Sequence, residues 1–221
     1  MSPDWWHARA AAFSPALINP PVPGPGICAT CRGPAPPRAR ECSSCRRMPQ
    51  RLDAVLPISW SVAGGPLHRA LRGYKDDSVR EVRDEWASGL QAVLECFLRE
   101  HERCAAAATG VGVFGLITTV PSRADRARGP LRALVRACPS TAGRYGRVLG
   151  RGVRGAAGHR FDPERFRAVR SVRGEAVLLI DVHVSSMSST ASPRTERTAR
   201  KRSGSKRWPA APRTPRPSTR P

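Results

Sequence analysis

The sequence has few acidic residues, few aromatic residues and no long hydrophobic run. Its 221 residues include 17 Asp and Glu against 38 Lys and Arg, which gives a formal net charge of +21. Aromatic residues make up 5% of the chain. The apolar stretch at residues 111–120 contains Thr and Gly and is too short to cross a bilayer. With no secretory signal recognisable, the sequence predicts a cytoplasmic protein that does not enter a membrane.

A further absence begins after Asp181, because residues 182–221 have no apolar periodicity. This segment has ten Lys or Arg residues, one acid (Glu196) and one aromatic residue (Trp208). Such a composition cannot bury enough apolar surface to offset the entropy of ordering a chain, so we predict a disordered basic tail. The Arg excess is compatible with nucleic-acid binding, and also with the codon bias of a GC-rich bacterium.

Helical and strand patterns alternate before that point. We expect an α/β fold with a parallel sheet, in three parts: an N-terminal helix and ribbon (1–53), an incomplete α/β domain (54–181) and the tail (182–221). The expected elements are a helix at 4–13, an edge strand at 55–63, a helix at 66–74 ending near Gly73, a one-faced amphipathic helix from 79 to the Ala-rich residues 105–109, a buried strand at 113–120, a helix at 130–137 and a buried strand at 177–180.

Four of the seven cysteines form two Cys-x2-Cys pairs, Cys28 with Cys31 and Cys42 with Cys45. Each pair can turn two sulfur atoms toward one ion, and tetrahedral zinc accepts four thiolates. No further His or Cys is placed beside an open coordination position, so we predict a structural zinc. Two disulfides or a chance spacing are the alternatives, and a cytoplasmic location disfavours disulfides. We interpret Cys96 as a small core residue of the long helix.

Asp181 directly follows an apolar run, Val177–Ile180, and so would lie at the carboxyl end of a strand. Ligands bind at the carboxyl edge of open α/β sheets, where backbone N–H groups of a following loop can hold a phosphate. Many buried strands end in Asp, so this motif by itself is weakly specific.

The other motifs of the chain make the strand that ends in Asp181 a more specific signal. The chain carries, in order, the four-Cys ribbon, the segment Leu71–Asp77 before the long helix, the Pro- and Arg-containing segment Val120–Gly129, and the strand ending in Asp181. In this order these motifs resemble the ComF (competence protein F) family of amidophosphoribosyltransferase-like proteins. The resemblance covers roughly residues 5–181. It implies a zinc ribbon, a type I phosphoribosyltransferase domain and, as the family name indicates, a link to DNA uptake.

The resemblance also implies roles for individual residues. Asp181 would bind the ribose hydroxyls of phosphoribosyl pyrophosphate, with Mg²⁺ as its companion ion. Four residues would lie near the pyrophosphate: Lys75, Ser122, Arg123 and Arg128. For each of the three cationic residues taken alone, the simpler interpretation is a solvated side chain on an Arg-rich surface.

The sequence departs from the family pattern after Asp181. The second acid of the family's loop is missing, and no glycine occurs before Gly204, so only the hydroxyls of Ser185 and Ser186 are left to contact a phosphate. We interpret His183 as a surface or turn residue. A change of reading frame near codon 181 is one hypothesis for this departure.

Three functions therefore stay open at this point. The chain is a phosphoribosyltransferase-like protein, a zinc-ribbon protein that binds nucleic acid through its basic surface and tail, or an inactive remnant of the family. The altered loop argues against a working transferase, and the acceptor substrate has no signature in the sequence.

Overall fold

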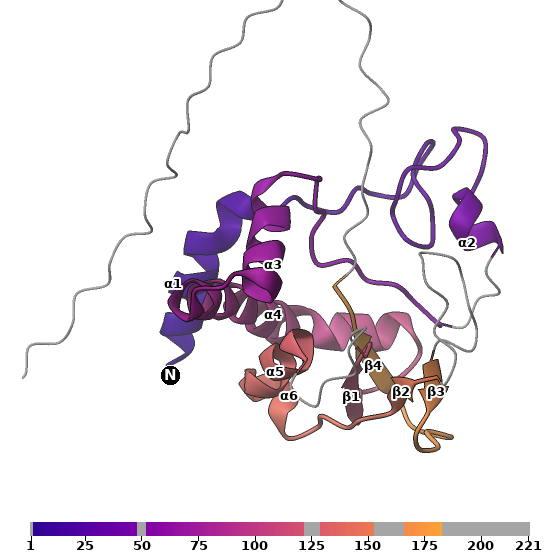
Figure 1. The fold of residues 1–221 in the computed structure, drawn as a ribbon. Coiled ribbons are helices and arrows are strands. Elements are labelled where there is room, and N and C mark those ends of the chain that lie inside the picture. Colours follow the sequence, from indigo (N-terminus) through magenta and orange to yellow (C-terminus); the bar gives the residue numbers. More distant parts are fainter. Residues whose placement is uncertain (1, 48–51, 122–128, 153–165, 183–221) are drawn as a thin grey trace, which may run out of the picture. The chain divides into compact units, whose positions relative to one another are not determined.

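The computed structural model describes residues 2–47, 52–121, 129–152 and 166–182 (Figure 1). Residues Met1–Ser188 form one compact unit, and the second unit, Ser189–Pro221, lies outside the described residues. The predicted disorder of the tail and the predicted boundary at residue 53 both stay predictions. The elements are α1 (Pro3–Phe13), η1 (Ser14–Ala16), α2 (Ser43–Arg47), α3 (Pro66–Asp76), α4 (Arg80–Ala108), β1 (Leu116–Thr119), α5 (Pro130–Ala137), α6 (Pro139–Ala142), β2 (Leu149–Arg151), β3 (Phe166–Ala168) and β4 (Val177–Ile180).

Helix α1 confirms the predicted helix at 4–13. The side chain of Ser2 accepts a hydrogen bond from the backbone N–H of Trp5, which satisfies one of the free donors at the helix start. Trp6 is 2% exposed and packs against Ala92 and Cys96 of α4. Helix α1 is therefore anchored on α4 by one buried indole, and Cys96 lies in a core, as its sequence position indicates.

Helix α3 continues past Gly73, where the sequence predicted its end. The reason is a close contact between helices: a Cβ atom at Gly73 would lie 2.5 Å from Nε1 of Trp86 in α4. Glycine lets the indole approach the backbone, so the residue serves packing and does not terminate the helix. The last turn of α3 consequently extends to Asp76 and includes Tyr74 and Lys75.

Helix α4 ends at Ala108, in the Ala-rich segment where its end was predicted. The predicted apolar face is confirmed at Leu90, Leu94, Phe97 and Leu98, which form or pack against the main core cluster, but the helix also has a second buried side that the pattern did not predict. Gly89, Ala92 and Cys96 are buried toward α1, whereas Leu94 and Leu98 belong to the main core cluster. Two apolar positions at the start of the pattern, Val79 and Val82, are 48% and 38% exposed. The helix is thus covered on more than one side, and its first turn is left open.

Strands β1 and β4 form a parallel pair, as predicted (Figure 1). Leu116 pairs with Val177 and Thr119 with Ile180, so the two strands end at the same edge. On the other side of β1, Ile117 forms a parallel bridge with Tyr145. Ile117 is fully buried in the main core, which also contains side chains of α4 and α5.

Three strand predictions need correction. Strand β1 begins at Leu116, and Val113 is 62% exposed instead of being buried in a strand. Strand β4 is half-buried along its length, because within the described residues only β1 pairs with it. The edge strand expected at 55–63 is absent: that segment makes one isolated bridge, from Trp60 to Ile18.

Strands β2 and β3, which the sequence did not predict, pair antiparallel in a separate small sheet. With the parallel pair and the helices, they give the part of the chain described here an α/β character. None of the helices in the described ranges has both the length and the apolar content needed to span a membrane.

Candidate metal centre and sheet edge

The first Cys pair sits in a tight turn. The backbone N–H of Arg32 donates to the carbonyl of Cys28 at 3.0 Å, and the N–H of Cys28 donates to the carbonyl of Gly33 at 2.7 Å. Arg32 has a φ of 61°, in the left-handed region, which turns the chain back toward the first cysteine. A Cβ at residue 33 would lie 3.2 Å from Sγ of Cys31, so glycine leaves space for that sulfur.

The second Cys pair begins at the start of α2. The backbone N–H of Cys45 donates to Sγ of Cys42 at 3.4 Å, which orients this sulfur as an acceptor. The two turns are joined by a backbone hydrogen bond of 2.9 Å from Ala29 to Arg40. A second link runs from the hydroxyl of Thr30 to the carboxylate of Glu41 at 2.5 Å. These local bonds bring both pairs to one point.

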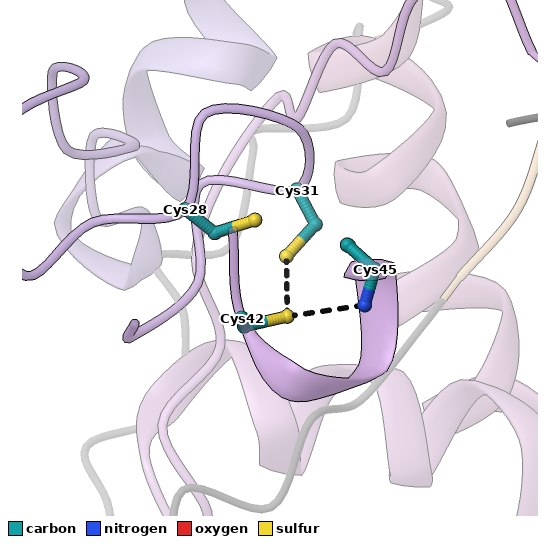
Figure 2. A group of neighbouring side chains, drawn as sticks. All are labelled: Cys28, Cys31, Cys42 and Cys45. Atoms are coloured by element: carbon teal, nitrogen blue, oxygen red, sulfur yellow. Dashed lines mark hydrogen bonds between the residues drawn. The ribbon is translucent and has the colours of Figure 1, made fainter. Parts of the chain in front are cut away.

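The four sulfur atoms of Cys28, Cys31, Cys42 and Cys45 lie within 4.8 Å of one another. Figure 2 shows the sulfurs of Cys28, Cys31 and Cys42 turned toward a common space. The Sγ atoms of Cys31 and Cys42 are 3.8 Å apart. Zinc–sulfur bonds of about 2.3 Å in a tetrahedron give sulfur–sulfur edges of about 3.8 Å. The cluster therefore fits a four-thiolate metal such as zinc.

The same sulfur–sulfur distances distinguish this metal-type cluster from a pair of disulfide bonds. All seven cysteines are free thiols, and a disulfide bond needs its sulfurs about 2.05 Å apart. Soft thiolate ligands in a tetrahedral set of four select zinc among the common divalent ions of proteins. Four cysteines would fill all four positions of such an ion, which is the arrangement of structural sites and not of catalytic ones.

Burial and hydrogen bonding act in opposite directions on these thiols. Burial raises the pKa of Cys28, but backbone hydrogen bonds from Cys31, Cys42 and Thr30 outweigh it and lower the pKa to about 6. Burial raises the pKa of Cys31, and burial together with the neighbouring sulfurs raises the pKa of Cys45. Cys28 is therefore the thiol of this set that ionises most readily, and a divalent cation would favour the thiolate form of Cys31 and Cys45 against the effect of their burial.

Asp181 occupies the position that the sequence indicated, at the carboxyl end of β4. It is exposed, and its Oδ1 accepts a hydrogen bond of 2.8 Å from the backbone N–H of Val182. Because Thr119 pairs with Ile180, Asp181 follows one residue beyond the end of both strands. Neighbouring strands are about 4.8 Å apart, so the carboxylate and the end of β1 border the same edge.

Lys75 is exposed in the last turn of α3. Its neighbour Tyr74 donates a hydrogen bond to the carbonyl of Pro130, the first residue of α5, and packs on the main core. This bond ties the end of α3 to the helix that follows β1 in the chain. Five other predicted site residues lie outside the described residues, as does His183: Ser122, Arg123, Arg128, Ser185 and Ser186.

Two residues that the sequence did not single out are connected to Thr119, Tyr145 directly and Arg132 through the Tyr145 ring. The hydroxyls of Thr119 and Tyr145 are 3.1 Å apart, and the guanidinium of Arg132 lies 5.7 Å from the centre of the Tyr145 ring. Tyr145 is one of only two tyrosines in the chain, which is the single sequence signal that could have marked it. Arg132 has no such signal among so many arginines.

Two acids of α4, Glu95 and Glu102, hold the segment that carries Tyr145. Glu95 is 2% exposed and accepts hydrogen bonds from the backbone N–H and the hydroxyl of Ser140, at 3.0 and 2.7 Å. Arg144 forms a two-point ion pair with Glu102 and also donates to the carbonyl of Phe114 at 2.9 Å. These contacts fix the segment that leads into Tyr145 at Ser140 and Arg144.

Comparisons with known proteins add no family: no family model matches this chain, and neither a curated protein nor a solved structure resembles it significantly.

Proposed function

We propose that this chain is a zinc-ribbon protein of the ComF type that binds phosphoribosyl pyrophosphate at the carboxyl edge of β1 and β4. The supporting observation is the common end of the two parallel strands, with Thr119 on one and Asp181 following the other. Sugar phosphates bind at such edges in open α/β sheets, because loops and helix N-termini there offer free donors. The four-thiolate cluster before this domain supports the same family order.

In this proposal the carboxylate of Asp181 accepts hydrogen bonds from the ribose hydroxyls. Its exposure leaves one oxygen and part of the other free for a ligand, since only Val182 of the described residues donates to it. Lys75, together with Arg123 and Arg128, supplies positive charge for the diphosphate. Mg²⁺ would neutralise further charge on the diphosphate when the sugar phosphate binds.

We propose binding, and not transfer, as the activity that this chain retains. A transferase must also stabilise the departing pyrophosphate, which needs donors placed close to its oxygens. The residues after Asp181 offer neither the second acid nor the glycine of the family pattern. Ser185 and Ser186 supply hydroxyl donors there, without the close backbone approach that glycine allows.

The test is a calorimetric titration of the zinc-loaded, full-length protein with phosphoribosyl pyrophosphate and Mg²⁺. Asp181→Asn should weaken binding at least about tenfold, because a neutral amide loses the charge-assisted hydrogen bonds to the hydroxyls. Asp53→Asn is the matched control, since Asp53 is also an exposed acid in the described part of the chain. Absence of binding by the unchanged protein would overturn the proposal.

Nucleic-acid binding by the ribbon is the second candidate. Four arginines of the ribbon are exposed and form no ion pair with another described residue: Arg38, Arg40, Arg46 and Arg47. Such cations gain affinity for a phosphate backbone by releasing its counterions, independently of base sequence. A metal-held ribbon would present them on a fixed backbone.

The salt dependence of oligonucleotide binding tests this candidate. Each phosphate contact contributes about 0.9 to the slope of log affinity against log salt, so Arg46→Gln with Arg47→Gln should reduce the slope by about 2. The control exchanges two exposed arginines of α4, Arg99 and Arg103, for Gln. Equal slopes for both double variants would remove the ribbon as the binding surface.

A further inference from the structure

A half-buried arginine beside the sheet edge has a donor that the fold does not use. The Nε atom of Arg132 is buried and makes no hydrogen bond to any other described residue. Buried donors are nearly always paired with protein, water or ligand, because an unpaired donor loses its hydrogen bond to water without a replacement. Arg132 is therefore a place where a partner from outside the described residues is expected.

The surroundings of Arg132 hold its guanidinium in position at the same time. The central carbon of its guanidinium lies 5.7 Å from the centre of the Tyr145 ring, and the Tyr145 hydroxyl is 3.1 Å from that of Thr119. Tyr145 is itself tied to β1, because the N–H of Gly146 donates to the carbonyl of Ile117 at 2.9 Å. An arginine held on an aromatic ring loses less conformational entropy when it meets an oxyanion.

The chemistry of these three groups is that of an anion site. A guanidinium offers donors in a planar fork that matches phosphate oxygens, and hydroxyl groups add single donors. Thr119 is the last residue of β1, so the group borders the edge that Asp181 also borders. A ligand held by its hydroxyls at Asp181 would extend its phosphate along this edge.

We propose that Arg132, supported by Tyr145 and Thr119, binds a phosphate oxygen of the sugar phosphate that the proposed function places at this edge. The inference deepens that function and rests on it for the sugar, but the anion contact itself belongs to Arg132. The guanidinium contacts the ligand directly. Tyr145 acts as a positioning residue through the ring beneath Arg132, and Thr119 holds the tyrosine hydroxyl.

The experiment measures binding of two probes, inorganic pyrophosphate and phosphoribosyl pyrophosphate with Mg²⁺, to the zinc-loaded full chain. Arg132→Gln should weaken both at least about tenfold, since a charge-assisted phosphate contact is lost. Arg132→Lys keeps the charge but not the fork, and should give an intermediate loss. Arg136→Gln is the matched control, because Arg136 is an exposed arginine one turn later on the same helix.

The variants also separate a binding role from a structural one. Tyr145→Phe keeps the ring and removes only the hydroxyl, so it should weaken binding by a smaller factor than Arg132→Gln while thermal unfolding shows that both variants fold. Equal affinities of Arg132→Gln and Arg136→Gln would overturn the inference. If the unchanged protein binds inorganic pyrophosphate but not phosphoribosyl pyrophosphate, and Arg132→Gln weakens that binding, the role of Arg132 is supported and the proposed sugar site is wrong. Binding of neither probe by the unchanged protein would overturn both.

Discussion

The Sγ atoms of Cys31 and Cys42 lie 3.8 Å apart, although 11 positions of the chain separate the two residues. That distance is the edge of a zinc–thiolate tetrahedron and nearly twice the length of a disulfide bond. Among the described residues, the backbone hydrogen bonds around the two pairs join positions at most 11 residues apart, so we expect the fold of this segment to depend on what the four sulfurs bind. Removing the metal should affect this segment first.

We expect a chelator that strips zinc to unfold the ribbon and to spare the contact between α1 and α4. The core of that contact is built by Trp6, Ala92 and Cys96, far in sequence from the Cys pairs. Trp60 is the natural reporter, because its indole lies within 3.6 Å of where a Cβ would stand at Gly33. Metal-dependent fluorescence should be present in the unchanged protein and largely absent in Trp60→Phe.

Hydrogen exchange provides the control for that prediction. After chelation, amides of residues 26–47 should exchange faster while those in the middle of α4 keep their protection. Equal loss of protection in residues 26–47 and in α4 would mean that the metal-binding segment and the helical core unfold as one unit. No change at the ribbon would contradict a structural metal there.

Gly89→Ala should destabilise the protein by about 1–3 kcal/mol, as overpacking of a tight contact does. A Cβ at this position would lie 2.4 Å from Cδ2 of Phe13, which packs edge-on against Trp86. The better helix propensity of alanine, about 1 kcal/mol, offsets only part of the clash. Urea unfolding of the zinc-loaded protein measures the difference.

Phe13→Leu in the same background should recover part of that loss, because the smaller side chain vacates the position of the new Cβ. Gly112→Ala is the comparison variant, since nothing lies within 4 Å of its ideal Cβ. It should change stability by less than about 0.5 kcal/mol. A larger effect at Gly112 than at Gly89 would show that α1 does not pack as described.

Alkaline pH should destabilise the fold partly through Tyr74. Burial raises the pKa of its phenol to about 12, from an ordinary value of 10.0. A raised pKa means that the folded state favours the protonated phenol, so this contribution is complete below pH 10 and is lost as pH rises toward 12. Tyr74→Phe lacks the group, and its stability should fall less steeply above pH 9.

At neutral pH the same variant should be less stable by about 1 kcal/mol, because it loses the hydrogen bond to the carbonyl of Pro130. The stability difference between the two proteins should therefore shrink as pH rises. Some alkaline loss should remain in Tyr74→Phe, since burial also raises the pKa of Cys138 to about 12. Parallel pH profiles for the two proteins would refute the role given to Tyr74.

The sequence could predict the features that depend on near neighbours in the chain. The spacing of Cys28, Cys31, Cys42 and Cys45 identified their convergence, because each pair is one turn and the pairs are close in sequence. The order of helices and the parallel strands also follow from local patterns. The segment at 55–63 had strand-like composition, but a strand needs a partner, and among the described residues this segment pairs only through Trp60.

The edge of the sheet could be predicted only in part. Asp181 was recognisable because an acid after an apolar run is a local signal. The group around Tyr145 was not, because it depends on contacts between residues 13 to 26 positions apart. The second buried side of α4 was missed for the same reason. A periodic pattern of apolar residues shows that a helix is buried, but not how many neighbouring elements pack against it.

X-ray absorption at the zinc edge, with a metal analysis of the same sample, tests the four-cysteine centre most directly. We expect one zinc per chain with four sulfur neighbours at about 2.3 Å, and loss of the stoichiometric metal in Cys42→Ser with Cys45→Ser. A metal-free protein purified in the presence of zinc, or zinc surrounded mainly by oxygen and nitrogen, would contradict the centre described here.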